Sequence, residues 1–303
     1  LVDVVVSLAT MGVVASLLEP VYRWMVAEVL GSRKVHTDDT SIQVQDPGSH
    51  KTKTARLWVY LGDGEHPHTV FDYTPSRARD GPAKFLEKYS GYLQADAYAG
   101  YDGIYAGKTV IEVACWAHAR RKFFEARETD ARADQMLALI GELYTVESQA
   151  RELELTPELR RELRQMKTRP ILERIKSWLD ECAQDALPKG PLGQAVRYAL
   201  KQWTALTRFV EDGILEADNN LAENALRRVA LGRKNYLFLG NDAGGRRAAI
   251  IYSLLASCRR HGVNPSDYLA DVLVRISTTP ASQVCQLAPA NWKPATPALP
   301  PTQ

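Results

Sequence analysis

Cysteine is scarce in this sequence of 303 residues, and the few cysteines lie far apart. Four are present, at Cys115, Cys182, Cys258 and Cys285, and no two of them have a paired spacing. A chain of this length buries a large core and needs no disulfide framework. The scarcity of cysteine therefore argues against a small secreted scaffold and favours the reducing cytoplasm.

An excess of one charge is also absent. Lys and Arg total 38 while Asp and Glu total 36, so the formal net charge is only +2. Total charge therefore does not indicate a nucleic-acid-binding protein, and any basic surface must be local. The composition, 45% hydrophobic and 24% charged, is ordinary for a globular chain. Its length predicts two lobes, or one domain that carries a large insertion.

Long hydrophobic runs are missing as well. The most apolar stretch, residues 4–18, is bounded by Asp3 and Glu19 and is shorter than the roughly 20 residues that span a bilayer. It lacks the basic start of a signal peptide, so we predict a buried helix and no membrane partner. The sequence begins at Leu1 rather than at Met, which we interpret as a piece of a longer protein.

The hydrophobic period changes several times along the chain and predicts an α/β fold with a mixed sheet that has helices on both faces. Segments rich in β-branched residues predict strands at 35–44, 56–61, 68–73, 92–95 and 109–114. Segments with a helical period are found at 4–30, 81–89, 117–128, 218–229, 245–261 and 265–276. Because the first three strands are consecutive, they predict an antiparallel meander.

The same changes divide the chain into segments. Between about residues 126 and 210 the strand pattern disappears, which predicts a helical insertion. The end of the chain is rich in proline, which predicts disorder. The expected segments are an N-terminal helical part (1–34), the first part of a catalytic domain (35–125), the insertion (126–215), the remaining catalytic helices (216–277) and a disordered tail (278–303).

Three carboxylates stand out by their positions: Asp38 inside the first strand, Asp96 at the end of a later strand, and Glu223 in the helix after the insertion. Carboxylates from neighbouring strands and a crossing helix can converge at one edge of a sheet, and phosphodiester cleavage uses such clusters to hold Mg²⁺. Each residue taken alone also has a simpler interpretation. Asp38 fits an edge or turn residue, Asp96 fits a helix cap, and Glu223 fits a first-turn residue paired with Arg227.

Short motifs that occur in order along the chain favour the catalytic interpretation. They are VHTDDT at 35–40, LQADAYAGYD at 93–102, CWAHARRKF at 115–123, DNNLAENALR at 218–227, GRKNYLF at 232–238 and IYSL at 251–254. Together they resemble the transposases of insertion-sequence family 66, and the resemblance runs from about Ser7 to Ile276. Asp39 stands where the family usually has Glu, and Ala97 where it often has Gly. Neither departure touches one of the three carboxylates.

The resemblance implies an Asp-Asp-Glu transposase with a ribonuclease H-like fold that a helical insertion interrupts. It places the catalytic, metal-binding acids at Asp38, Asp96 and Glu223, with two Mg²⁺ ions as cofactor and Mn²⁺ as a substitute. Cleavage at the ends of a mobile element would release a 3′ hydroxyl that attacks target DNA. The implied partners are double-stranded DNA, a second copy of the chain in a homo-oligomer, and other proteins of the element, in the nucleoid of a bacterial cytoplasm.

Basic residues gather locally near these motifs, and arginine and lysine side chains there fit contacts with DNA phosphates. We predict such contacts for Arg120, Arg121, Lys122, Arg227, Arg228, Arg233, Lys234 and Arg246. Each cluster alone also fits a solvated face.

Cys115 and His118 form a Cys-x-x-His pair, but a zinc site needs four ligands and no second pair has a suitable spacing. For this pair, as for Asn220, we predict a structural or site-shaping role. Two rival functions stay open. One is a nuclease of the same fold that does not join DNA, and the other is a DNA-binding remnant without catalysis.

Overall fold

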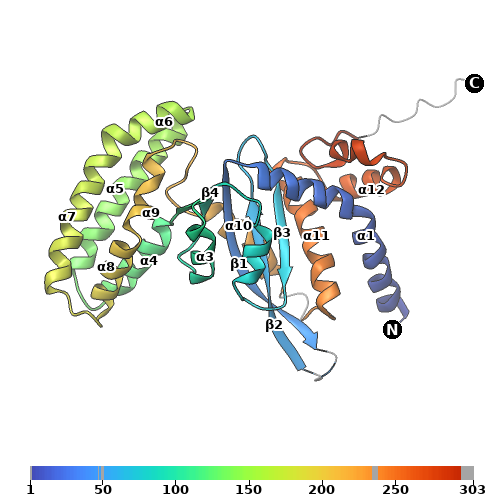
Figure 1. Cartoon of the computed structure of the whole chain (residues 1–303), viewed down its shortest axis with the longest axis horizontal. Coiled ribbons are helices and arrows are strands. Elements are labelled where there is room, and N and C mark those ends of the chain that lie inside the picture. Colours follow the sequence, from blue (N-terminus) through green and yellow to red (C-terminus); the bar gives the residue numbers. More distant parts are fainter. Residues whose placement is uncertain (1, 47, 49–50, 234–237, 295–303) are drawn as a thin grey trace, which may run out of the picture. The chain divides into compact units, whose positions relative to one another are not determined.

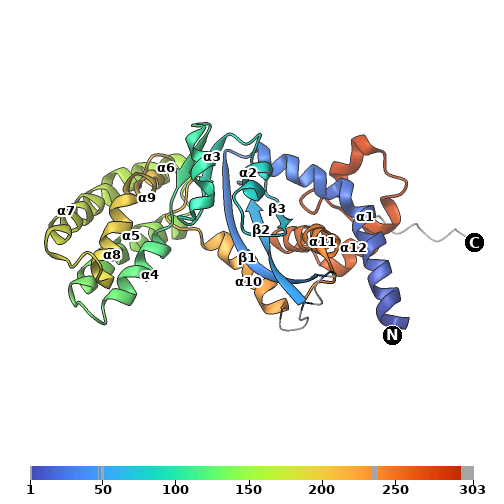
Figure 2. The same ribbon diagram turned by 60° about the horizontal axis from the view of Figure 1, so that its bottom comes forward.

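The computed structural model describes residues 2–46, 48, 51–233 and 238–294. The chain is an α/β protein with two compact units, labelled by element in Figures 1 and 2. Unit 1 comprises Leu1–Gly91 and Leu221–Gln303, and unit 2 comprises Tyr92–Asn220. Within the described ranges, no helix combines the length and the apolar character that crossing a membrane would require.

Unit 1 contains an antiparallel meander in the order β3-β2-β1, as the sequence predicts. Its strands are β1 (Lys34–Asp46), β2 (Lys51–Leu61) and β3 (Thr69–Thr74). Asp38 pairs with Val59, and Val59 pairs in turn with Phe71. Because successive strand residues point to opposite faces, even-numbered residues of β1 share one face of the sheet and odd-numbered residues share the other.

Helices cover both faces of this three-stranded sheet. The helical elements of unit 1 are α1 (Val2–Gly31), α2 (Asp80–Phe85), α10 (Asn220–Gly232, in this unit from Leu221), α11 (Asp242–Arg260), α12 (Pro265–Arg275) and η4 (Ala281–Leu287). On the first face, side chains of α10 and α11 join an apolar cluster with all three strands. On the opposite face, Tyr60 of β2 stacks on Phe85 of α2, with ring centroids 3.8 Å apart. The predicted helical cover is confirmed for this part of the sheet.

Helix α11 lies beside β3 (Figure 2), and two of its serines accept hydrogen bonds from that strand. The N–H of Phe71 donates to Ser253 Oγ at 2.8 Å, and the N–H of Thr69 donates to Ser257 Oγ at 2.9 Å. Both serines are fully buried. An edge strand normally leaves a row of backbone groups unpaired. Here serines one helical turn apart satisfy two of those groups, the N–H groups of Thr69 and Phe71.

The C-terminal segment corrects one expectation. Residues 278–303 were predicted to be disordered, but Ala281–Leu287 form the 3₁₀-helix η4, and Leu287 is fully buried. The hydroxyl of Tyr268 donates to the carbonyl of Leu287 at 2.7 Å, and Trp292 Nε1 donates to Asp271 at 2.7 Å. The proline content predicted disorder because proline disfavours regular structure. The segment is ordered instead by its contacts with α12, which proline content does not reveal. Residues 295–303 lie outside the described range.

Unit 2 combines two neighbouring strands with a bundle of helices (Figure 1). Its elements are β4 (Gly91–Gln94, in this unit from Tyr92), η1 (Ala99–Tyr101), α3 (Asp102–Ala106), β5 (Val110–Val113), α4 (Trp116–Ala126), α5 (Arg132–Glu152), α6 (Pro157–Leu163), η2 (Arg164–Thr168), α7 (Arg169–Asp185), α8 (Pro191–Lys201), α9 (Trp203–Thr207) and η3 (Arg208–Val210). Pro157 and Pro191 each begin a helix, where the missing N–H costs nothing. Pro157 and Pro191 therefore mark helix starts within the predicted insertion.

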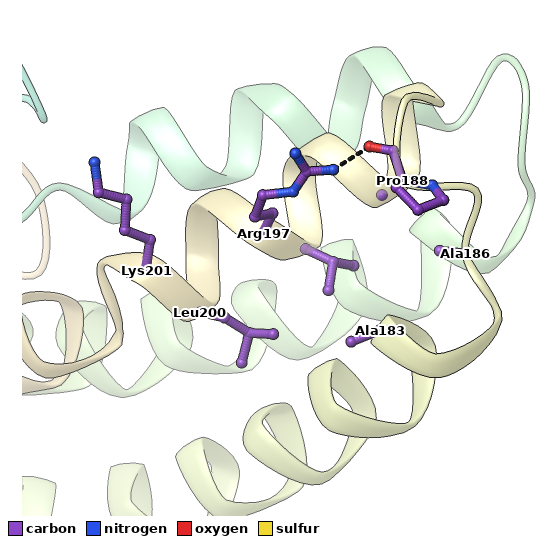
Figure 3. A pocket seen from close by; sticks show the side chains of 8 residues that line it. Ala183, Ala186, Pro188, Arg197, Leu200 and Lys201 are labelled. Carbon is purple, nitrogen blue, oxygen red and sulfur yellow. Dashed lines mark hydrogen bonds between the residues drawn. The ribbon is translucent and has the colours of Figure 1, made fainter.

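An open groove lies between α7 and α8 (Figure 3). Its volume is about 520 Å³, and its lining is mainly small and apolar, with two cations of α8 beside it. The lining residues are Ala183, Ala186, Pro188, Gly193, Val196, Arg197, Leu200 and Lys201. None of these lining residues is a carboxylate, so the groove contains none of the predicted acids.

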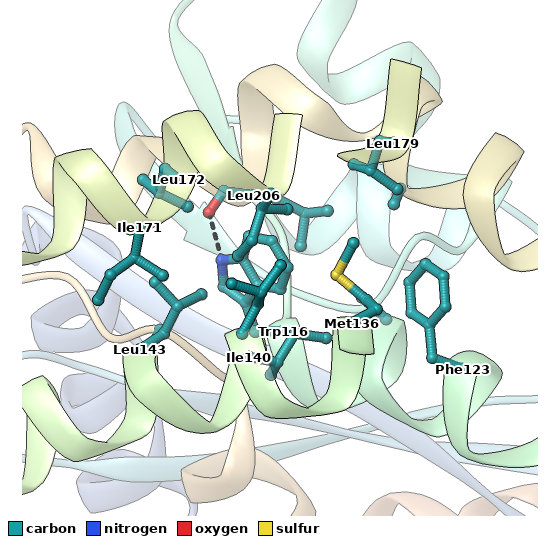
Figure 4. Close-up of a cluster of buried hydrophobic side chains, with 14 of the residues drawn as sticks. Trp116, Phe123, Met136, Ile140, Leu143, Ile171, Leu172, Leu179 and Leu206 are labelled. Atoms are coloured by element: carbon teal, nitrogen blue, oxygen red, sulfur yellow. Dashed lines mark hydrogen bonds between the residues drawn. The ribbon is translucent and has the colours of Figure 1, made fainter. Parts of the chain in front are cut away.

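An apolar cluster of buried side chains forms the core of unit 2 (Figure 4). Trp116, at the start of α4, is fully buried in it, and its Nε1 donates to the carbonyl of Leu206 at 2.8 Å. Phe123 of α4 and Ile140 of α5 are also fully buried in this cluster. Trp116 is therefore a core residue.

A charged network is buried beside this core. Arg164 is fully buried and makes two hydrogen bonds of 2.7 Å with the carboxylate of Glu147. Arg160 bridges Glu147, at 2.6 Å, to Glu216, at 2.5 Å. Arg164 also donates to the backbone carbonyls of Phe209, Asp212 and Leu215. The network thus ties α5 and η2 to residues 209–216, which lead back out of the helical bundle.

Candidate active site

Asp38 lies on the face of the sheet that α10 and α11 cover. The even-numbered neighbours Ile42 and Val44 belong to the apolar cluster that contains Ala222 and Leu226 of α10. Asp38 shares their face by the alternation of β1 and is half-buried. Its Oδ1 accepts the N–H of Asp39 at 2.7 Å, which orients the carboxylate.

Asp39 lies on the opposite face and is occupied by ion pairs. Its Oδ2 accepts from Arg56 Nη1 at 3.0 Å, and its Oδ1 accepts from Arg77 Nη2 at 2.8 Å. Only 2% of the side chain of Asp39 is exposed. Because both carboxylate oxygens are held by guanidinium groups, Asp39 does not fit the requirements of a metal ligand. The two adjacent aspartates have different environments.

Glu223 lies on the first turn of α10. The buried side of this helix presents Ala222, Leu226 and Val229 to the sheet, and half-buried Glu223 flanks that side. Just before the helix, Asp218 Oδ1 accepts the N–H of Asn220 at 3.0 Å, and Asp218 Oδ2 accepts from Asn220 Nδ2 at 2.9 Å. Asn220 therefore contacts Asp218 at the start of the helix, and its site-shaping role stays a prediction.

Asp96 belongs to unit 2, where it follows the end of β4. The N–H of Ala95 donates to the carbonyl of Val113 at 3.1 Å, so the strand pairing reaches the residue before Asp96. Gln94 is fully buried, and its side-chain amide donates to the carbonyls of Glu216, at 2.6 Å, and Asp218, at 3.1 Å. The end of β4 is thereby fixed to the segment that precedes α10. Asp96 is half-buried at this junction.

Cys115 fixes the same segment from a second strand end. The N–H of Asn219 donates to Cys115 Sγ at 3.2 Å, and the N–H of Trp116 donates to the carbonyl of Ala217 at 3.0 Å. Burial raises the pKa of the Cys115 thiol to about 12, although hydrogen bonds from the backbone of Asn219 and His118 oppose the shift. Cys115 thus acts as a buried hydrogen-bond acceptor, which is a structural role. The prediction that Cys115 and His118 hold no zinc stays a prediction.

The predicted DNA-binding residues have different environments. Exposed side chains are those of Arg120, Arg121, Lys122, Arg227, Arg228 and Arg246. Arg233 is half-buried and donates to the backbone carbonyl and, at 3.1 Å, to the hydroxyl of Ser41 in β1. Lys234 lies outside the described residues. Arg233 therefore anchors the end of α10 to the sheet, whatever further contact it makes with DNA.

Sequence reasoning missed the residues that hold the acidic segments in place. The sequence pattern placed Gln94 in a strand and Glu147, Arg160 and Arg164 in the helical insertion, and it gave none of them an individual role. A glutamine between apolar residues of a short strand was the available signal, because a buried amide needs partners. No comparable signal marks Glu147, since exposed and buried glutamates look alike in a helix of mixed composition.

The donor groups of the three predicted acids fit Mg²⁺. All three are carboxylates, the ligand type that this ion prefers, and all are half-buried rather than fully enclosed, so that ions and water can reach them. Asp38 and Glu223 belong to unit 1 and Asp96 to unit 2. Asp39 fails the same test because both its oxygens accept from arginines.

Comparisons with known proteins agree with these motifs. The model of the IS66 transposase family matches residues 6–247, and that of the IS66 C-terminal element matches residues 253–290. In Sinorhizobium fredii (strain NBRC 101917 / NGR234), the uncharacterized protein y4hP is 34% identical over 94% of this chain and 55% of its own length. The uncharacterized protein y4jD is 33% identical over 92% of this chain and 58% of its own length. The chain therefore spans little more than half the length of these relatives. Because the family model covers most of its residues, the chain belongs to the IS66 family of transposases.

Proposed function

We propose that this chain is the catalytic part of a DNA transposase, with Asp38, Asp96 and Glu223 as the ligands of two Mg²⁺ ions. The observation that carries the proposal is the contrast between Asp38 and Asp39. Asp38 shares its sheet face with the helix that bears Glu223, whereas Asp39 is neutralised by two arginines on the other face. Membership in a transposase family supports the choice of DNA as substrate.

The proposed fold is ribonuclease H-like. The antiparallel order β3-β2-β1 with helices on both faces supports it, as does the long helical segment that separates β5 from α10. In this arrangement β1 contributes the first acid and α10 the last. The apolar residues of α10 fix the rotation of that helix on the sheet, and this packing determines where the carboxylate of Glu223 points.

The proposed reaction has two steps. Water attacks a phosphodiester at the end of the element, which breaks the P–O3′ bond and leaves a 3′ hydroxyl and a 5′ phosphate. The 3′ hydroxyl then attacks a target phosphodiester, forms a new P–O bond and displaces the 3′ oxygen of the target strand. Mg²⁺ held by the carboxylates would activate the attacking oxygen and stabilise the leaving one. The acids of the chain orient the reacting groups, and its exposed cations bind phosphates.

The experiment incubates the chain with duplexes that carry the element ends, a supercoiled target and Mg²⁺. We expect Asp38→Asn, Asp96→Asn and Glu223→Gln each to lower cleavage and joining by more than about 100-fold, beyond the range for residues that only support a metal ligand. Asp180→Asn, which removes an exposed acid of α7, is the matched control and keeps normal activity.

The same assay separates the alternatives. Asp39→Asn, measured per folded molecule, retains cleavage because that carboxylate faces away from α10. An inactive Asp39→Asn variant together with an active Asp38→Asn variant would place the site on the face of Asp39 and contradict the proposal. Cleaved ends without joined product would favour the nuclease, and DNA binding without either product in the unmodified chain would favour the inactive remnant.

A further inference from the structure

Charge is unevenly distributed among the four long helices of unit 2. From the sequence, α4 and α8 together carry five Lys or Arg residues and one acid, Glu125. By the same count, α5 and α7 together carry five Lys or Arg residues and eight Asp or Glu residues. Helix α8 has no acid at all. One pair of helices is therefore locally basic and the other locally acidic, within a chain that is nearly neutral overall.

The cations of the two helix pairs also differ in their partners. On α7, Arg174 is paired with Glu142 at 2.6 Å and Lys176 with Asp180 at 2.6 Å. In the part of the chain that the structure describes, the cations of α4 and α8 form no ion pair with a carboxylate; they are Arg120, Arg121, Lys122, Arg197 and Lys201. Their positive charge is therefore available to an external anion.

Figure 3 shows how the two cations of α8 are placed. Arg197 and Lys201 extend from one side of the helix, away from Leu200 and Ala183, which face the groove toward α7. Arg197 donates to the backbone carbonyl of Pro188, which holds its guanidinium over the end of the preceding loop. Residues four apart on a helix lie above one another, so the two cations form one stripe.

Aromatic rings lie beneath cations on this basic side. Lys122 Nζ is 4.8 Å from the ring centroid of Tyr198, which joins α4 to α8. Arg127, just after α4, lies 3.9 Å from the ring centroid of Phe124, and 42% of Phe124 is exposed. A cation held over a ring stays fixed without losing its charge. These contacts orient positive groups toward solvent rather than neutralising them.

The start of α4 lies close to Asp96 within unit 2. The N–H of Ala95 donates to the carbonyl of Val113 at 3.1 Å, and α4 begins three residues after Val113, at Trp116. Burial raises the pKa of Tyr198 above its ordinary value, and the charges of Cys115, Asp96 and Glu112 raise it further. Glu112, whose carboxylate interacts with Lys201, is a second acid in this neighbourhood. Phosphates bound along α4 and α8 would consequently lead toward a predicted metal ligand.

We propose that the basic face of α4 and α8 binds the DNA backbone next to Asp96, with the stripe of α8 as a contact that the helical bundle adds. The face consists of Arg120, Arg121, Lys122, Arg197, Tyr198 and Lys201. Charge complementarity selects the partner, since a group of cations that form no ion pair with a carboxylate fits a polyanion. The inference rests on the proposed function for the choice of DNA, and it assigns α8 a role that the sequence motifs do not include.

The test measures binding of the chain to a duplex of random sequence by fluorescence anisotropy, at several salt concentrations and without Mg²⁺, so that cleavage plays no part. The double variant Lys122→Ala/Lys201→Ala removes one cation from each helix of the face. Its matched control, Lys167→Ala/Lys176→Ala, removes two exposed lysines from η2 and α7, where they contact Gln149 and Asp180. Both variants change the net charge equally.

The slope of log K against log salt is negative, and we expect the face variant to reduce its magnitude by about 1.8, since each lost phosphate contact contributes about 0.9. Affinity near 0.1 M salt should fall about tenfold or more, whereas the control should differ from the unmodified chain by less than about twofold. Thermal melting of both variants should match that of the unmodified chain, because all four lysines lie on the surface.

Each outcome supports or overturns the proposal. Equal losses in both variants, or no loss in either, would show that the face is not special, while the catalytic proposal would stand. An unmodified chain that binds no DNA at low salt would overturn both. Displacement of the bound duplex by polyglutamate at equal charge concentration would indicate an acidic protein as partner and would contradict the choice of DNA.

Discussion

The two units bury polar groups in different ways. In unit 1, the sheet face that bears Asp38 packs apolar side chains against α10 and α11, and neutral serine hydroxyls complete the edge of β3. In unit 2, a network of two arginines and two glutamates is buried or half-buried beside the apolar core. The difference follows from what each unit has to fix: a sheet has a regular ladder, whereas residues 211–219 have no regular structure and need side-chain partners.

The buried network fits that task because each of its charged side chains has an oppositely charged partner. The guanidinium of Arg164 donates two hydrogen bonds to the carboxylate of Glu147 and further hydrogen bonds to three backbone carbonyls. Removing a charge from water costs several kcal/mol, so such a network adds little net stability over an apolar core. What it provides is a defined path for the chain toward α10. The loss of one charged side chain should therefore lower the free energy of unfolding by much more than the whole network contributes to it.

The largest expected effect is that of Glu147→Gln in unit 2. This change leaves Arg164, which is fully buried, without its counter-charge and should lower the free energy of unfolding by about 3–5 kcal/mol. Glu142→Gln is the matched control, because its ion pair with Arg174 is exposed and should contribute little to stability. Hydrogen exchange of amides in α5 and α7 measures both values within unit 2.

Equal rates of amide hydrogen exchange in the Glu147→Gln and Glu142→Gln variants would contradict the contrast between the units.

The contribution of Glu147 to stability should also depend on pH. Burial alone would raise the pKa of Glu147, but the hydrogen bonds and charges of Arg164 and Arg160 hold it below its usual range. A carboxyl whose pKa is lowered by folding stabilises the fold above its unfolded pKa and loses that contribution as the pH falls through the folded pKa. Glu147→Gln should remove this part of the acid sensitivity.

A buried histidine gives unit 1 a pH dependence of its own. His68 is 2% exposed, and burial lowers its pKa from 6.5 to about 4, helped by the charges of His261 and Arg260. Because the folded state favours the neutral form of His68, its contribution to stability is fully present above pH 6.5 and declines as the pH falls toward 4. The shift corresponds to at most about 3 kcal/mol. The difference in unfolding free energy between the unmodified chain and His68→Gln should therefore vary over this pH range.

The paired measurement is needed because Asp72 acts in the opposite direction. Burial raises the pKa of Asp72 to about 6, so its contribution to stability declines as the pH rises from 3.8 to 6. The two effects nearly cancel in the unmodified chain, and only the difference between the two proteins isolates His68. A difference that stays constant from pH 7 to pH 4 would show that His68 titrates normally.

Sequence reasoning worked where the structure depends on local period. The strand predicted at 35–44 forms β1, whose alternation puts Asp38 and Asp39 on opposite faces, and the meander and the helix that bears Glu223 were placed correctly. It failed where contacts are long-range. Leu287 is ordered by Tyr268 across a turn, and Gln94 by a segment more than 100 residues away. Whether the three acids hold metal depends on chemistry that neither period nor packing tests.

The smallest expected effect is that of Ser253→Ala in unit 1, the neutral counterpart of the glutamate change. The buried hydroxyl of Ser253 accepts the N–H of Phe71 and donates to the carbonyl of Ala249, four residues earlier in α11. Its removal leaves one buried backbone donor unsatisfied, at a cost of about 1–3 kcal/mol. Ser16→Ala is the control, because Ser16 makes the same type of bond to the carbonyl of Gly12 on an exposed part of α1, where water replaces it. Urea denaturation followed by circular dichroism measures both variants. A cost for Ser253→Ala as large as that of Glu147→Gln would show that neutral and charged buried groups are equally critical here, and the contrast between the units would then lie only in their secondary structure.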